Sequence, residues 1–154
     1  MITKDPKDLR ARFEKLLRDT GRENIDYVIE DLDAWGFFTA PASSQGHGAY
    51  PGGLLEHSLN VYDAAMEARQ AMLTLRPDLE EDLAPESIAI AALLHDVCKA
   101  DFYRLVKKKR RNEVGQYEDF EQYEIHDENF PVGHGEKSVI LLLQSGLDLK
   151  DDEI

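Results

Sequence analysis

Five segments of the chain place apolar residues at helical spacing, and glycines, prolines or short polar connections separate them. In the first segment Asp5 offers an N-cap acceptor, Pro6 presets the backbone for a first helical turn, and Gly21 ends the pattern. The patterns predict helices over residues 6–20, 23–35, 54–75, 85–94 and 136–144.

The third and fourth predicted helices carry unexpected polar residues. In the third, a histidine heads a stripe of small and apolar side chains that we expect to point inward: His57, Val61, Ala64, Ala65, Ala68 and Met72. The fourth is apolar on all sides from Ile88 to Leu94, which predicts the buried centre of the fold. It runs directly into His95, Asp96 and Lys99, and buried polar groups cost several kcal/mol unless they are paired or bind a metal.

Two regions break the helical pattern. Residues 39–53 are rich in Gly, Pro, Ser and Ala, which predicts a surface loop whose His47 makes it a candidate wall of a site. Residues 103–108 and 117–125 show β-type residues with partial alternation, which is typical of a hairpin. The acidic tail is read as the first turn of a further helix. The fold class is therefore all-α, with a small β-hairpin insertion.

The composition is that of a globular protein, and we expect residues 1–154 to form a single domain. The longest apolar runs fall far below the roughly 20 residues that cross a bilayer, so no membrane partner is expected. The single cysteine, Cys98, cannot form an intramolecular disulfide, which agrees with a cytoplasmic location and excludes cysteine-based structural zinc.

The net charge of −13 opposes general binding to a nucleic-acid backbone. The exception is Lys107 to Arg111, five consecutive cations in an acidic chain. Two interpretations stay open for them, a local contact for a polyanion and a solvated hairpin tip, and the second is favoured.

The polar residues after the fourth helix also have two interpretations each. His95 and Asp96 point about 100° apart and could reach one cation beyond the helix end, where the helix dipole favours a cation. Alternatively, Asp96 pairs with a neighbour and His95 with a carbonyl. The Lys99 ammonium would repel such a cation unless a phosphate lay between them. Alternatively, the Lys99 side chain satisfies the last carbonyls of the helix. Taken alone, His57 is more often a hydrogen-bonded core histidine than a ligand.

Three segments together resemble the HD superfamily of metal-dependent phosphohydrolases. They are HGAYPGGLLEHS from His47, LLHDVCK from Leu93 and FPVGHGEKS from Phe130, in an order of His and then His-Asp that gives the superfamily its name. The first is similar to the HD domain appended to a bacterial 3′-to-5′ exoribonuclease, and to small stand-alone HD hydrolases. The resemblance runs from residue 47 to about 145 and implies an HD-like helical bundle.

The resemblance also implies roles for individual residues. His57, His95 and Asp96 correspond to ligands of one or two divalent ions, which could be zinc, iron, manganese, cobalt or nickel. Asp96 and Lys99 carry the catalysis, and Lys99 also contacts the substrate phosphate. His134 corresponds to a substrate contact or a second-metal ligand. His47 and Lys137 also correspond to substrate-binding positions, although the resemblance is weaker there.

Two positions depart from the family's pattern. Cys98 stands where the family usually has glycine, and it could pack as a small hydrophobe or offer a soft ligand. The family takes its last ligand, an aspartate, from a later helix, and the only late candidates here are Asp148, Asp151 and Asp152. Their acidic setting suits a helix N-cap better than a ligand, so either the chain continues past Ile154 or the site is incomplete.

The expected function is hydrolysis of a small phosphorylated substrate, such as a nucleotide, by metal-activated water. The leading alternative is an HD-shaped module that binds a nucleotide or a protein partner without turnover. A third possibility, less favoured, is an RNA-processing component in which Lys107 to Arg111 guide a strand towards the site.

Overall fold

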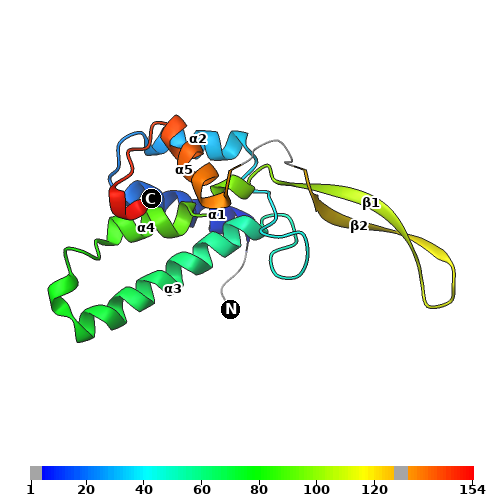
Figure 1. Ribbon diagram of the computed structural model, residues 1–154, viewed down its shortest axis with the longest axis horizontal. Coiled ribbons are helices and arrows are strands. Elements are labelled where there is room, and N and C mark those ends of the chain that lie inside the picture. Colours follow the sequence, from blue (N-terminus) through cyan, green and yellow to red (C-terminus); the bar gives the residue numbers. More distant parts are fainter. Residues whose placement is uncertain (1–4, 127–131) are drawn as a thin grey trace.

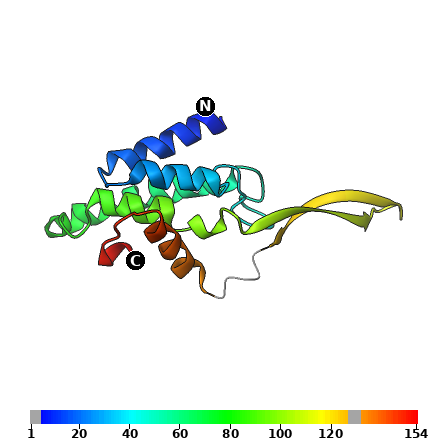
Figure 2. The ribbon, with the colours of Figure 1, turned by 90° about the horizontal axis from the view of Figure 1, so that it is seen from above.

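The computed structural model describes residues 5–126 and 132–154. Over these residues the chain forms a helical body from which one two-stranded antiparallel hairpin projects (Figures 1 and 2). The α-helices are α1 (Pro6–Asp19), α2 (Ile25–Ala34), α3 (Gly53–Leu75), α4 (Pro85–Leu94) and α5 (His134–Gln144). The strands are β1 (Tyr103–Arg111) and β2 (Tyr117–Ile125), and the short 3₁₀ turns are η1 (Pro77–Leu79), η2 (Val97–Lys99) and η3 (Asp151–Glu153). The predicted helical fold with a small hairpin is confirmed.

Local chemistry sets the helix starts near the predicted positions. The Asp5 carboxylate accepts the Lys7 N–H at 2.8 Å and caps α1, as the sequence predicts. Helix α2 starts two residues later than predicted, because Asn24 adopts a left-handed backbone with φ of 64°. The Asn24 side chain donates to the Gly146 carbonyl at 2.9 Å, which ties the start of α2 to the end of α5.

The hydrophobic core lies where α1, α2 and the N-terminal half of α3 meet α4. Three phenylalanine rings, Phe13, Phe37 and Phe38, pack together with centroids 5.1–5.8 Å apart. Six of the ten residues of α4 are buried, which confirms its central place, although Ala91 is exposed. Leu142 of α5 and Leu147 extend the same core towards the C-terminal tail.

The expected inward stripe on α3 is only partly covered, since Val61 and Ala65 are half-buried and other members of the stripe are exposed. All the buried residues of α3 lie between Gly53 and Leu59, whereas Ala64, Ala68 and Met72 are exposed. Helix α3 is 23 residues long and its partner α4 only ten, so the far half of α3 extends past the body (Figure 1). Periodicity shows which side chains share a face, but it does not show how much of that face a partner covers.

The basic run is also placed differently from the prediction. Lys107 to Arg111 lie within β1, and the tip of the hairpin is formed by residues 112–116. Across the ladder, three cations contact acidic residues of β2: Lys107 with Glu121, Lys108 with Glu124 and Arg110 with Glu118. The basic strand is therefore neutralised largely by its own partner strand.

The C-terminal tail lies against the start of α4. It forms only the 3₁₀ turn η3, in place of a regular first turn of a further helix. The Arg22 guanidinium donates to the Asp148 carbonyl at 2.9 Å and pairs with Glu153, whose side chain is fully buried. Lys150 reaches Glu86, in the first turn of α4, at 3.7 Å. Among the described residues, no helix is both long and apolar enough to cross a membrane.

Candidate metal centre

The polypeptide changes its helical form at Asp96. Helix α4 ends at Leu94 with His95 as its C-cap, and Asp96 leaves helical geometry with φ of −109° and ψ of 19°. The next turn is the 3₁₀ turn η2, in which the Lys99 N–H donates to the Asp96 carbonyl at 2.9 Å. This break changes the direction of the Asp96 side chain relative to that of His95.

His57 reaches the break from the second turn of α3. The loop before α3 fixes where this helix starts, since Gly52 has φ of 82° and a Cβ on Gly53 would lie 2.1 Å from the Gly48 carbonyl oxygen. The Leu54 N–H also donates to the Ala40 carbonyl at 3.0 Å. The two glycines of the sequence motif therefore have a local reason, which is to let the loop pack closely against the helix that carries His57.

The break and the loop bring three donor atoms to one point. His57 Nε2 lies 3.2 Å from His95 Nε2, and each of these nitrogens lies 3.4 Å from Asp96 Oδ2. Donor atoms that share one ion at about 2.0–2.2 Å lie roughly 3.0–3.5 Å apart in tetrahedral or octahedral geometry. The spacing of His57, His95 and Asp96 therefore fits a single metal ion.

Hydrogen bonding orients the His95 ring. His95 Nδ1 lies 2.8 Å from the Ala92 carbonyl oxygen, so Nδ1 carries the proton of the neutral ring and donates it there. The lone pair of the neutral ring is then on Nε2, which faces the other two donors. A metal-binding histidine in proteins usually has such a partner on its second nitrogen.

The electrostatics of the three groups favour an ionised carboxylate between two imidazoles. Burial alone would raise the pKa of Asp96, but its hydrogen bonds with His95 and Lys99 outweigh burial and hold that pKa well below its usual range. Burial and the neighbouring His95 lower the pKa of His57. The hydrogen bond to Asp96 raises the pKa of His95, despite the opposing effect of burial.

Lys99 is part of the same cluster. Its ammonium donates to Asp96 Oδ2 at 2.7 Å, and both side chains are largely shielded from solvent. For His95 and Asp96 the sequence left two interpretations open, metal binding and pairing with protein groups. The structure combines them, because Asp96 pairs with Lys99 and His95 with a carbonyl while all three candidate ligands still converge.

The model of the HD domain family matches residues 54–154. The chain belongs to the HD domain family. Neither a curated protein nor a solved structure gives a match. The matched part of the HD domain contains His57, His95 and Asp96, whereas the loop with His47 precedes it.

The late aspartates do not complete the metal site of this HD domain. Asp148, Asp151 and Asp152 are exposed, and no grouping among the described residues joins them to the two histidines. Lys150, which lies between them in the chain, reaches Glu86 in the first turn of α4, whereas His95 caps the other end of that helix. Over the described part of the chain, the cluster offers three protein ligands.

The other predicted site residues surround the cluster at different positions. His47 is exposed and lines a pocket of about 370 Å³ together with His57, Glu56 and Asn60. His134 begins α5 with Nδ1 3.4 Å from Cys98 Sγ, and its ring packs edge-on against Phe102. Lys137 lies half-buried one turn further along α5. Phe130 and Pro131 of the quoted motif lie outside the described residues.

Cys98 and Ser138 are two buried residues next to the cluster, and only Cys98 was a candidate ligand in the sequence. Cys98 is buried, burial raises the pKa of its thiol, and it is not in the metal-ligand grouping, which favours its packing as a small hydrophobe. Ser138 ends the motif FPVGHGEKS and has no role assigned from the sequence, yet its buried hydroxyl contacts the backbone on both sides of Asp96. The signal that could have found it is a small polar residue within an apolar helix.

Proposed function

We propose that this HD domain is a metal-dependent phosphohydrolase in which His57, His95 and Asp96 hold a divalent ion. The observation that carries the proposal is the convergence of two imidazole nitrogens and one carboxylate oxygen within 3.2–3.4 Å. Three protein ligands with an open position are the usual arrangement of catalytic, as opposed to structural, zinc sites. The same donor set also suits iron, manganese, cobalt and nickel.

The chain's own residues have separate tasks in this proposal. A bound divalent ion supplies Lewis acidity that activates water and neutralises phosphate charge. Asp96 stays ionised because its oxygen accepts from Lys99 and interacts with His95. An ammonium has three N–H donors, so Lys99 can hold Asp96 with one and a phosphate oxygen with another. His134 and Lys137, at the start of α5, are further substrate contacts in this proposal.

The proposed substrate is a small phosphate ester, such as a nucleotide. The pocket of about 370 Å³ beside His57 has the size of a small-molecule site, and His47 lines it as a proposed substrate contact. A net charge of −13 disfavours a long polyanion. The cations of β1 that contact acidic side chains of β2 give no open basic track for RNA. We assign the protein to the cytoplasm on its single unpaired cysteine.

A second candidate function is binding of a nucleotide without turnover. It is favoured by one observation: the described residues offer three metal ligands, and the one carboxylate among them is shared with Lys99. A bound ion there would compete with an ammonium for Asp96 Oδ2, which lowers the affinity for the metal. Turnover therefore separates the two candidates.

The test combines metal content with phosphate release. The purified chain is stripped of metal, reloaded separately with zinc, manganese, cobalt, nickel or iron(II), and assayed for phosphate release from a panel of nucleoside monophosphates. We expect one ion per chain by elemental analysis and phosphate release with at least one metal. In H95A both are lost, whereas H126A, which removes an exposed histidine paired with Arg104 on the hairpin, retains both. A full metal content in H95A contradicts the ligand assignment, and nucleotide binding without phosphate release selects the second candidate.

A further inference from the structure

The break at Asp96 removes two hydrogen bonds from the backbone of α4. In a continuous α-helix the His95 carbonyl would accept from the Lys99 N–H, and the Cys98 N–H would donate to the Leu94 carbonyl. Instead, the Lys99 N–H donates to the Asp96 carbonyl. The His95 carbonyl and the Cys98 N–H therefore need other partners, because unpaired backbone groups in a protein interior are rare.

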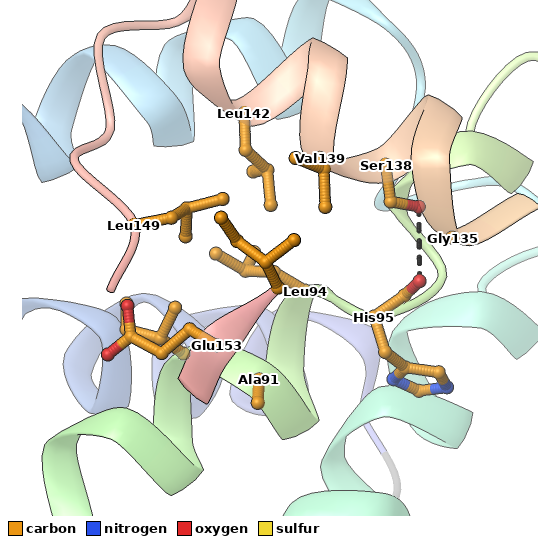
Figure 3. A pocket seen from close by; sticks show the side chains of 11 residues that line it. Ala91, Leu94, His95, Gly135, Ser138, Val139, Leu142, Leu149 and Glu153 are labelled. Carbon is orange, nitrogen blue, oxygen red and sulfur yellow. Dashed lines mark hydrogen bonds between the residues drawn. The ribbon is translucent and has the colours of Figure 1, made fainter. Parts of the chain in front are cut away.

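One hydroxyl on α5 satisfies both groups. Ser138 Oγ accepts the Cys98 N–H at 3.1 Å and donates to the His95 carbonyl at 3.0 Å. The second of these bonds is the dashed line in Figure 3, which shows the His95 ring turned away from Ser138 and towards α3. Ser138 is only 3% exposed, so water does not readily replace its hydroxyl. A serine hydroxyl is small enough to enter the break, and it can donate and accept at the same time.

We propose that Ser138 is the positioning residue that holds the His95–Asp96 turn in its metal-binding form. The inference rests on the proposed metal site. Ser138 does not touch the cluster itself, because it bonds to backbone atoms on either side of Asp96. Through these two bonds it fixes the backbone angles from which the His95 and Asp96 side chains leave the chain.

The consequence of losing the hydroxyl follows from helix geometry. Without it, the two backbone groups stay unpaired or the segment recovers its hydrogen bonds by continuing α4 as a regular helix. In a regular helix the φ of Asp96 would be about −63° instead of −109°, which would turn its side chain away from the direction that brings Oδ2 to 3.4 Å from His95 Nε2. The metal site would then lose the close approach of the Asp96 carboxylate, while the core of α4 stayed packed.

The same region contains a matched control. Ser145, at the C-cap of α5, is also buried, but its hydroxyl donates to the Leu141 carbonyl at 3.1 Å, four residues earlier in the chain. This bond makes no link to α4 or η2. Ser145→Ala therefore removes a buried hydroxyl from the same helix without touching the turn.

The experiment measures zinc affinity and, separately, amide hydrogen exchange at the turn in the metal-free protein. Full-length wild type, S138A, S138T and S145A are titrated with Zn²⁺ by calorimetry, and exchange of the Cys98 amide is followed by NMR in the metal-free proteins. We expect S138A to bind zinc about 10–100-fold more weakly, the range for outer-shell partners of metal ligands, and to exchange the Cys98 amide faster. S138T keeps the hydroxyl, and the adjoining cavity of about 170 Å³ has room for its methyl group, so both values stay near wild type. S145A stays near wild type as well.

The outcomes separate this inference from the proposed function. Zinc affinity and Cys98 exchange unchanged in S138A overturn the role of Ser138, and so does an equal loss of affinity in S145A. If the wild type does not bind zinc or another divalent ion, the proposed function fails, and the exchange data still decide whether Ser138 holds the turn. If S138A does not fold, the same comparison is made with S138C, whose thiol is a weaker donor and acceptor than the hydroxyl.

Discussion

The hairpin and the turn after α4 both concentrate charged and polar side chains, but they use them in opposite ways. In the hairpin, cations of β1 face anions of β2 across a ladder that is open to solvent. In the turn, His57, His95 and Asp96 bring two imidazole nitrogens and one carboxylate oxygen to one point, where they could hold a metal ion. The densest run of charge in the sequence is therefore not the place where the structure gathers metal-binding groups.

The two regions also differ in how rigidly they are held. The ladder partners of the hairpin are exposed side chains, and exposed ion pairs contribute little to stability. The turn after α4 is held by the two hydrogen bonds of the Ser138 hydroxyl to its backbone, by packing of α5 against η2, and by packing of α4 against α1 and α3. Preorganised geometry is the property that a metal site needs.

The largest expected effect comes from exchanging one carboxylate for an amide in each region. We expect Asp96→Asn to weaken zinc binding by more than about 100-fold, because an anionic ligand and its charge are lost. Asp119→Asn, on the exposed face of β2, leaves zinc binding unchanged. The measurement is calorimetric titration of the metal-free proteins. Equal affinities for D96N and D119N would remove the distinction between the two regions.

Exchanging a lysine in each region gives the next largest effect. Lys99→Ala removes a cation from Asp96 Oδ2, so metal binding is retained, while KM for a phosphate ester rises about tenfold or more through loss of a charge-assisted hydrogen bond. Lys108→Ala, which breaks an exposed pair with Glu124, changes neither quantity. Steady-state kinetics with the metal-loaded enzyme give both values. A loss of metal from K99A with KM unchanged would assign Lys99 to the metal site and not to substrate.

A smaller effect is expected at the other end of α4, where a buried ion pair can be compared with the exposed pairs of the hairpin. Burial tends to raise the pKa of Glu153, but its hydrogen bonds with Arg22 outweigh burial and lower it. A lowered folded-state pKa stabilises the fold above the unfolded value near 4.5, and that contribution is lost as pH falls through the folded pKa.

Arg22→Ala should therefore destabilise the protein at neutral pH and flatten the loss of stability on acidification. The cost should stay below the about 3–5 kcal/mol of a fully buried pair, because the Arg22 side chain is 14% exposed. Arg110→Ala, which breaks an exposed hairpin pair, gives little change. Urea unfolding at neutral and acidic pH measures both variants, and an R22A profile parallel to that of wild type would exclude this source of pH dependence.

Much of the fold was predictable because its signals are local. Caps, glycines and apolar spacing located the five α-helices of the described residues, and β-type residues located the hairpin. Three features depended on long-range packing and were not predictable: the exposed far half of α3, the basic residues inside β1, and the tail folded against the start of α4.

The candidate ligands were predictable from residue types and the family resemblance, but the hydrogen bonds around them were not. His57, His95 and Asp96 appear in the sequence as a histidine on one helix and a His-Asp pair at the end of another. A small polar residue in an apolar helix draws notice to Ser138, but its proposed role does not follow from that signal, since the turn that it contacts lies some 40 residues away. Lys99 was read as a choice between a phosphate contact and the last carbonyls of the helix, whereas its side chain donates to the Asp96 carboxylate.

The most direct test of the metal site is a crystal structure of the zinc-loaded protein with anomalous data collected at the zinc edge. The account predicts one anomalous peak about 2.0–2.2 Å from His57 Nε2, His95 Nε2 and Asp96 Oδ2. A peak elsewhere in a fully loaded protein, or a peak bound by only one of these three residues, would contradict it.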